Sequence, residues 1–156
     1  CELTIFAVTG ERKETKRYRV LFVDDQNAMW SKLAQVAAES AYEEAGRFTS
    51  AGVTPAEGFS EALMRFCKER GISLTEGDAP LSLAQAVDRS RHYHVIVGLG
   101  IDPAKVMDDV PFRSVVLVWD LAEDGLSKDS TAEDAYRALM HRIRELMATL
   151  GVRDNE

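Results

Sequence analysis

Residues 19–32 have the sequence Arg19-Val-Leu-Phe-Val-Asp-Asp-Gln-Asn-Ala-Met-Trp-Ser-Lys32 (RVLFVDDQNAMWSK), which gives the clearest indication of the fold. Its apolar and β-branched beginning predicts a buried strand over 18–23, and the polar residues that follow predict a loop that opens a helix. In α/β proteins, a loop between a strand and a helix N-terminus commonly binds phosphate through backbone amides. This loop instead carries two adjacent carboxylates, Asp24 and Asp25, and has no basic residue before Lys32. The sequence therefore places negative charge where anions usually bind.

The size and composition of the chain indicate one globular domain. It has 156 residues, of which 46% are hydrophobic and 29% charged. Its net charge of −7 argues against nucleic-acid binding, which requires clustered Lys and Arg to neutralise phosphates. Two cysteines, Cys1 and Cys67, form no disulfide framework, and we expect Cys67 to be a small core residue in a cytoplasmic protein. No apolar run is long enough to span a membrane, so we expect no membrane partner.

Apolar periodicity divides the chain into alternating strands and helices. Strands are predicted over 3–8, 18–23, 47–50, 93–97 and 114–119, and helices over 29–45, 57–70, 81–89, 103–108 and from 130 onward. Ser130 and Glu133 have the spacing of a capping box at the start of the last helix.

Buried strands that alternate with helices predict a doubly wound, three-layer α/β fold with a parallel sheet of about four strands. Residues 1–17 are expected to form an extra N-terminal strand and a linker, and 18–152 the domain itself. In such sheets the functional site lies at the carboxyl ends of the strands. Asp24 and Asp25 follow one strand and Asp120 follows another, so we expect these carboxylates at the site edge.

Four short blocks, in order, resemble the low-molecular-weight protein tyrosine phosphatase superfamily, including its thioredoxin-coupled arsenate reductase branch. The first block, Val20-Leu-Phe-Val-Asp-Asp-Gln-Asn-Ala-Met-Trp-Ser-Lys-Leu-Ala34, resembles the family's catalytic loop and its flanks. The others are Thr49-Ser-Ala-Gly52, Glu69-Arg-Gly-Ile-Ser-Leu74 and Trp119-Asp-Leu121, the last followed by Asp124 and a long helix. The resemblance covers residues 19–150 and implies the phosphotyrosine phosphatase I-like fold.

The same resemblance implies that the family's chemistry is lost. In the family, a Cys thiolate attacks phosphorus or arsenic, backbone amides hold the oxyanion, and an Arg clamps it. Asp24 stands at the Cys position and Trp30 at the Arg position. A carboxylate about 4 Å from an anion would repel it by about 4 kcal/mol at an effective dielectric near 20. We therefore predict no catalytic residue that works by the family mechanism.

Other family positions are retained. Asn27 and Ser31 match residues that hold the loop's shape. Asp124, with Asp120 as second candidate, matches the family's general acid, although Gly125 replaces the usual Pro. Trp30 is expected to fill the emptied pocket or, as the alternative, to form a contact surface for a partner.

These observations predict a catalytically inactive domain that acts as a binding, regulatory or assembly module, without a cofactor. The candidate binding residues are Asp24, Asp25, Gln26, Asn27, Ala28, Met29, Trp30 and Ser31. We expect a protein partner or a homodimer, with strand 3–8 adding to a sheet edge or pairing between subunits.

Two alternative functions stay open. The first is a phosphoryl-transfer enzyme that uses Asp24 as nucleophile or binds Mg²⁺ through Asp24, Asp25 and either Asp120 or Asp124. The plainer interpretation of these acids is solvated carboxylates at strand ends, some of which cap the following helix. The second alternative is an accessory domain of a longer enzyme chain.

Two weaker signals have simple explanations. The segment Val20-Leu-Phe-Val-Asp-Asp-Gln26 also resembles the start of a response-regulator receiver domain, but the later strand ending at 95–100 offers no phosphoacceptor Asp. His92 and His94 would share one face of a strand at a spacing compatible with zinc. No third ligand accompanies them, so two ordinary histidines at a strand start are the favoured interpretation.

Overall fold

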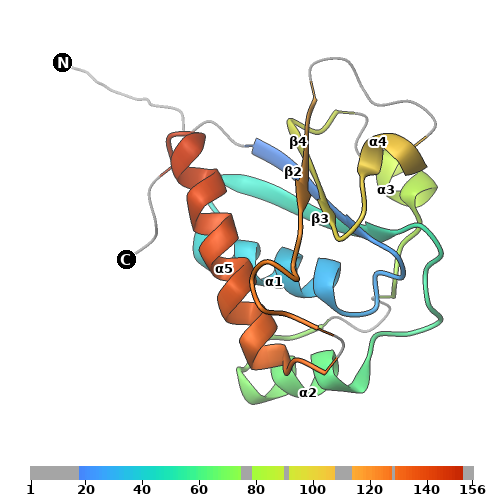
Figure 1. Cartoon of the computed structure of the whole chain (residues 1–156), viewed down its shortest axis with the longest axis vertical. Coiled ribbons are helices and arrows are strands. Elements are labelled where there is room, and N and C mark those ends of the chain that lie inside the picture. Colours follow the sequence, from blue (N-terminus) through green and yellow to red (C-terminus); the bar gives the residue numbers. More distant parts are fainter. Residues whose placement is uncertain (1–17, 75–78, 90–91, 108–113, 128, 153–156) are drawn as a thin grey trace.

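The computed structural model describes residues 18–74, 79–89, 92–107, 114–127 and 129–152 (Figure 1). Its elements are β2 (Tyr18–Asp24), α1 (Trp30–Tyr42), β3 (Gly46–Gly52), α2 (Glu61–Glu69), α3 (Leu83–Arg89), β4 (Val95–Leu99), α4 (Pro103–Val106), β5 (Val115–Trp119) and α5 (Ala132–Thr149). The predicted strand over 3–8 lies outside the described residues. None of the helices in these segments combines the length and apolarity that crossing a lipid bilayer requires.

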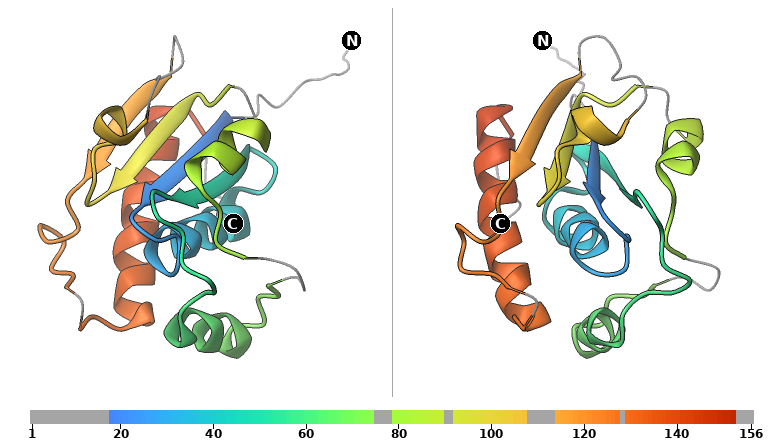
Figure 2. Two further views of the ribbon diagram at one scale, coloured as in Figure 1. Left: turned by 90° about the vertical axis from the view of Figure 1, so that its right-hand side faces the viewer. Right: turned by 45° about the vertical axis from the view of Figure 1, so that its right-hand side comes forward.

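The sheet has four strands in the order β3-β2-β4-β5, and every pairing is parallel. Helices α1 and α5 lie on one side of it, and α3 lies on the other (Figures 1 and 2). The predicted three-layer α/β fold is thus confirmed. Because all four strands are parallel, their carboxyl ends share one edge of the sheet, and the loop after β2 lies at that edge.

Two hydrophobic clusters bury the two faces of the sheet. The larger one joins the sheet to α1, α2 and α5, and Cys67 lies within it, as predicted for a core residue. The smaller one lies on the α3 side. Successive residues of a strand point to opposite faces, so β2 supplies Val20 and Phe22 to the larger cluster and Leu21 and Val23 to the smaller. A strand buried on both faces must be apolar throughout, which explains its sequence.

Helix α2 begins later than the predicted residue 57. Ser60 is its N-cap, and the Ser60 hydroxyl accepts a hydrogen bond from the Leu63 amide at 3.2 Å. The backbone of Ser60 also donates to the loop after β2, to the Ala28 carbonyl at 2.9 Å. Ser60 therefore joins the loop to the start of α2, and the helix begins after it.

The predicted capping box at the start of α5 is wrong by one residue. Thr131 is the N-cap, and its hydroxyl accepts a hydrogen bond from the Asp134 amide at 3.1 Å. The Ser130 hydroxyl accepts from the Ser127 amide at 2.9 Å instead. Ser130 thus closes the turn before the helix, which leaves the cap to its neighbour.

Candidate functional site

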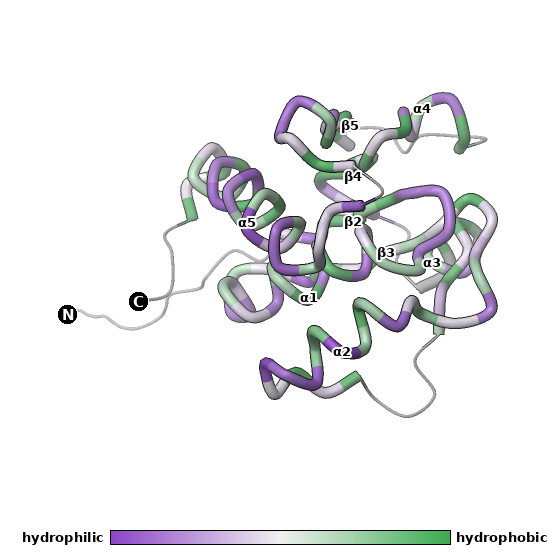
Figure 3. Tube along the Cα trace, turned by 60° about the horizontal axis from the view of Figure 1, so that its bottom comes forward, coloured by the Kyte–Doolittle hydropathy of each residue, from purple (hydrophilic) through white to green (hydrophobic). Residues whose placement is uncertain are grey.

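The loop after β2 lies against residues 52–60. Four backbone amides of this segment donate hydrogen bonds to carbonyl groups of the loop and hold those carbonyls toward the segment. Figure 3 shows the loop as a hydrophilic stretch between the apolar strand β2 and helix α1. The four hydrogen bonds are Val53 N to Asp24 O at 3.0 Å, Thr54 N to Asp25 O at 2.7 Å, Ala56 N to Gln26 O at 3.0 Å and Ser60 N to Ala28 O at 2.9 Å. These bonds fix the orientation of four peptide groups in the loop.

The outward carbonyls turn the next amides the other way. In a trans peptide the N–H points opposite to the preceding carbonyl, and no cis peptide occurs among the described residues. The N–H groups of residues 25, 26, 27 and 29 therefore point away from residues 53–60, and that of Asn27 donates to the Asp24 carboxylate. Successive inward amides at a helix N-terminus form an anion-binding concavity. We call these four N–H groups and that of Ser31 the amide cradle.

The carboxylate of Asp24 accepts hydrogen bonds from two amides of this cradle. Its Oδ1 accepts from the Asn27 amide at 2.6 Å, and its Oδ2 accepts from the Ser31 amide at 3.1 Å. Ser31 lies in the first turn of α1, whose N-cap residue, Met29, makes no side-chain capping bond. Asp24 therefore caps the helix from the end of β2, and its negative charge faces the positive end of the helix dipole.

The environment of Asp24 has opposing effects on its ionisation. Burial raises the pKa of the carboxyl above its usual value, and the nearby charge of Asp25 raises it further. Hydrogen bonds from Asn27 and Ser31 favour the ionised form and lower the pKa, but burial outweighs them. The cradle thus holds a carboxyl that is more easily protonated than an exposed one.

Asn27 fixes the shape of the loop. It is 1% exposed and has φ +53°, a left-handed conformation that Asn tolerates better than most residues. Its amide nitrogen donates to the Ser31 hydroxyl at 2.8 Å, and its Oδ1 accepts from the Leu81 amide at 2.8 Å. The side chain therefore joins the loop to α1 and to the segment before α3.

Gly52 allows β3 to approach the loop closely. A Cβ at this position would lie 2.6 Å from the Gln26 carbonyl carbon and 2.7 Å from the Asn27 nitrogen. Both are backbone atoms that cannot rotate away, so a larger residue would displace the loop.

The other residues of the loop offer no positive charge to a ligand. Trp30 is half-buried and packs against the larger core cluster, as Met29 does. The ammonium group of Lys32 lies 5.4 Å from the centre of the Phe59 ring. Asp25 and Gln26 are exposed, and Ala28 is half-buried.

The candidate acids Asp124 and Asp120 are both engaged in other contacts. Arg142 of α5 forms a two-pronged ion pair with Asp124, with nitrogen–oxygen distances of 2.9 and 3.2 Å. The hydrogen bond to Asp124 raises the pKa of Arg142. The Asp120 Oδ1 accepts from the Ala122 amide at 3.0 Å. Sequence reasoning missed Arg142, whose only signal was its place on the helix that follows this acidic turn.

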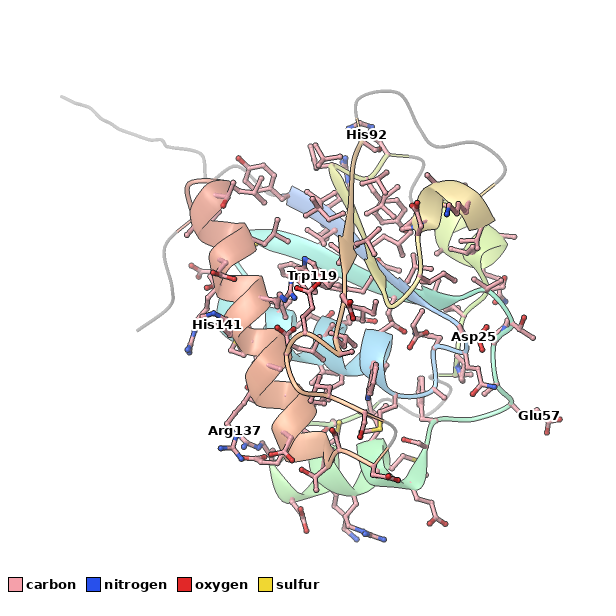
Figure 4. The ribbon with its side chains drawn as sticks, in the orientation of Figure 1. Asp25, Glu57, His92, Trp119, Arg137 and His141 are labelled. Carbon is pink, nitrogen blue, oxygen red and sulfur yellow. The ribbon has the colours of Figure 1, made fainter. Side chains whose placement is uncertain are left out.

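The described residues contain no group of three His, Cys, Asp or Glu side chains close enough to hold a metal ion. His92 and His94 do lie together, with ring centroids 5.0 Å apart, but the His94 Nδ1 accepts a hydrogen bond from the Arg19 amide at 2.9 Å. Figure 4 shows His92 and Asp25 at opposite ends of the sheet. The structure therefore does not bring the histidines to the loop acids.

Comparison with solved structures places this arrangement among known folds. The thioredoxin-dependent arsenate reductase of Corynebacterium glutamicum matches with a TM-score of 0.68 and 21% identity, over 88% of this chain and 63% of that one. The low-molecular-weight tyrosine phosphatase of Tritrichomonas foetus matches with a TM-score of 0.67 and 15% identity, over 90% of this chain and 100% of that one. The fold is that of the low-molecular-weight tyrosine phosphatases and arsenate reductases.

A third similar structure, the arsenate reductase of Archaeoglobus fulgidus, has a TM-score of 0.60 and 23% identity, over 83% of this chain and 98% of that one. No protein-family model matches the sequence, and no curated protein sequence matches it either. The chain spans less than two thirds of the corynebacterial reductase. At these identities the likeness establishes the fold alone.

Proposed function

We propose that this chain is a phosphatase-fold domain that neither hydrolyses phosphate esters nor reduces arsenate, and that it acts as a binding, regulatory or assembly module. The proposal rests on one observation: the Asp24 carboxylate accepts hydrogen bonds from the backbone amides of Asn27 and Ser31. The loop thus has backbone amides arranged as in an anion-binding site, but the chain's own Asp24 carboxylate already accepts hydrogen bonds from two of them.

Physical chemistry supports an inactive loop in three ways. A carboxylate whose two oxygens both accept hydrogen bonds from backbone amides is a weaker nucleophile than the Cys thiolate that the family uses. Its charge would repel an incoming phosphate or arsenate. Trp30, which stands at the family's Arg position, cannot supply the two-pronged clamp that holds an oxyanion. A phosphate or arsenate would therefore be neither held by a positive charge nor attacked by a strong nucleophile in this loop.

The retained contacts support a binding role. The bonds from residues 53–60 and the Asn27 side chain keep the loop in one conformation. A rigid loop of this kind presents Asp25 and Gln26 to solvent at the site edge. Loops positioned by a scaffold in this way commonly carry binding function. We therefore assign the partner-binding surface to the loop, residues 24–31.

Activity assays test the proposal directly. We expect the purified chain to hydrolyse p-nitrophenyl phosphate, and to reduce arsenate with thioredoxin and its reductase, no faster than a buffer blank. The double variant Asp24→Cys with Trp30→Arg restores the nucleophile and the clamp, and we expect it to gain measurable phosphate affinity by calorimetry. Trp30→Arg alone is the matched control, because it keeps the repelling carboxylate. Turnover by the unmodified chain above the blank would overturn the proposal.

The metal-dependent alternative has its own test. If Asp24 and Asp25 bind Mg²⁺ for phosphoryl transfer, millimolar Mg²⁺ will raise the melting temperature of the wild type, and Asp24→Asn will abolish the rise. We expect no Mg²⁺-dependent shift in either protein. A shift that Asp24→Asn removes would favour the enzyme over the binding module.

A further inference from the structure

Strand β5 forms an apolar edge of the sheet. It pairs with β4 on one side only, and Figure 2 shows it as the outermost strand. Val115 is 53% exposed and Val118 is 51% exposed. Natural proteins usually protect an edge strand with charged residues, Pro or a covering segment. The sequence of β5, which is Val-Val-Leu-Val-Trp, contains neither a charge nor Pro.

The backbone of β5 has hydrogen-bonding groups on its outer side. The Val115 amide donates to the His94 carbonyl, and the Trp119 carbonyl accepts from Gly100, so residues 115, 117 and 119 face β4. Peptide groups alternate along a strand, so the N–H and C=O groups of Val116 and Val118 point away from β4. Within the described segments, these groups have no backbone hydrogen-bond partner. They can therefore pair with another strand.

The opposite edge of the sheet, which is formed by β3, is better protected. The Gly52 amide at its end donates to the Leu81 carbonyl at 2.8 Å, and Gly52 forms a parallel bridge with Ser82. Arg47 also places an exposed charge on β3. A charge and a covering segment are two of the usual protections of an edge. Of the two edges, that of β5 is therefore the better one for a further strand.

We propose that two copies of this chain associate through β5, with the two strands antiparallel about a two-fold axis at Leu117. With the axis at this residue, Val116 lies opposite Val118 of the second copy, and Val118 lies opposite Val116 of the second copy. Each of these pairs can exchange two hydrogen bonds, because both of its members point their peptide groups at the other strand. The edge is thus complementary to itself, as a two-fold interface requires.

The same register gives each exposed valine an apolar neighbour. Val118 lies on the same side of the sheet as Val116, which packs against the smaller cluster, so Val118 would contact Val116 of the second copy. Val115 lies on the other side and would contact Trp119 of the second copy, a residue of the larger cluster. Cross-strand pairs of β-branched and aromatic residues stabilise a sheet. Association would therefore cover both exposed valines.

The charge next to β5 also favours this register. Asp120 follows the strand and is exposed. About an axis at Leu117, Asp120 lies opposite Ser114 of the second copy, so the two Asp120 carboxylates stay at opposite ends of the interface. In a parallel pair they would lie side by side, and neighbouring like charges destabilise a sheet. The sequence of β5 and its flanks therefore suits a second copy in the antiparallel orientation.

The size of the interface and the charge of the chain set the expected affinity. One pair of five-residue strands is a small interface, so we expect a weak dimer with a dissociation constant of about 50 µM. Each copy carries a net charge of −7, and the two copies therefore repel each other at long range. Raising the salt concentration to about 0.5 M should screen this repulsion and strengthen the dimer.

Sedimentation of the full chain tests the dimer, whatever the loop after β2 binds. We expect mostly dimer at about 500 µM and mostly monomer at about 5 µM. Val118→Lys places a charge against Val116 of the second copy and should raise the dissociation constant about tenfold or more. Met64→Lys is the matched control, because Met64 is 48% exposed on α2 and the charge change is the same. It should dimerise like the wild type.

Amide hydrogen exchange of the wild type, followed by NMR, tests the interface without any variant. We expect the Val116 and Val118 amides to exchange about threefold more slowly at about 500 µM than at about 20 µM, because only the monomer exposes them. The Val115 and Leu117 amides, which face β4, are the internal control. Their exchange should not depend on concentration.

Three outcomes would overturn the proposal. The first is a monomer at every concentration, with unprotected Val116 and Val118 amides. The second is a dimer that Val118→Lys leaves as stable as Met64→Lys does, which would place the interface elsewhere on the chain. The third is protection of Val116 and Val118 that is independent of concentration in a monomer, which would assign the edge to another part of the same chain.

Discussion

Replacement of Asn27 measures how strongly its side chain holds the loop. Asn27→Ala removes the hydrogen bonds to Ser31 and Leu81, each 2.8 Å long and each worth about 1 kcal/mol net. The part-buried Leu81 amide then lacks its acceptor, and alanine must adopt φ +53°, which costs about 1 kcal/mol more. We expect a total loss of about 3–4 kcal/mol in the free energy of unfolding.

Asn27→Gly is the matched control, because it loses the same hydrogen bonds but tolerates the left-handed φ. We expect it to lose about 2–3 kcal/mol, roughly 1 kcal/mol less than the alanine variant. Urea unfolding followed by Trp fluorescence measures both losses, with unchanged slopes showing that the unfolded states are comparable. Equal losses in the two variants would refute the backbone argument. A loss below about 1 kcal/mol in both would refute the role of the side-chain bonds.

Three further variants test the surroundings of the loop. Gly52→Ala should lose about 2–3 kcal/mol or more of stability in thermal melts, because the added Cβ would collide with the loop backbone. Gly58→Ala is the control and should change stability by less than about 0.5 kcal/mol, because its Cβ would meet nothing within 4 Å. Arg142→Gln should cost about 1 kcal/mol at low salt and less at high salt, because the pair with Asp124 is part-exposed; no salt dependence would contradict this. Burial raises the pKa of Asp24, so the native state binds the Asp24 proton more tightly than the unfolded state does. The contribution of Asp24 to the free energy of unfolding should therefore be largest below the ordinary pKa of the unfolded state. It should fall as the pH rises through the raised pKa of the folded state. The same urea titrations on Asp24→Asn should lack this fall, and an equal fall in both proteins would contradict the assignment.

The sequence predicted the framework of the fold well because burial on both faces leaves a strong signal. The apolar run of β2 and the order of strands and helices follow from that requirement. Helix starts were predicted less well, since they depend on which of several adjacent polar groups is already engaged. Ser130 and Thr131 can both cap a helix, and the sequence alone does not show that Ser130 bonds to Ser127.

The candidate site was predicted in position but not in detail. The sequence placed Asp24 at the end of a strand and Asn27 and Ser31 in the loop after it. Helix capping was the plainer interpretation of the loop acids, but the sequence could not show that Asp24 is the acid that caps, or that it does so through the Asn27 and Ser31 amides, because that geometry depends on the contacts from residues 53–60. Nor did it predict that Arg142 pairs with Asp124, since the two residues lie on different elements.

We propose that the carboxylate of Asp24 occupies the amide cradle in place of an external anion. A phosphate titration at neutral pH, followed through the amide resonances of residues 25–31, tests it most directly. We predict no saturable shift in the wild type or in Asp25→Ala, and shifts at Asn27 and Ser31 in Asp24→Ala, where the two amides lose their internal acceptor. Saturable phosphate shifts at these amides in the unmodified chain would contradict the claim.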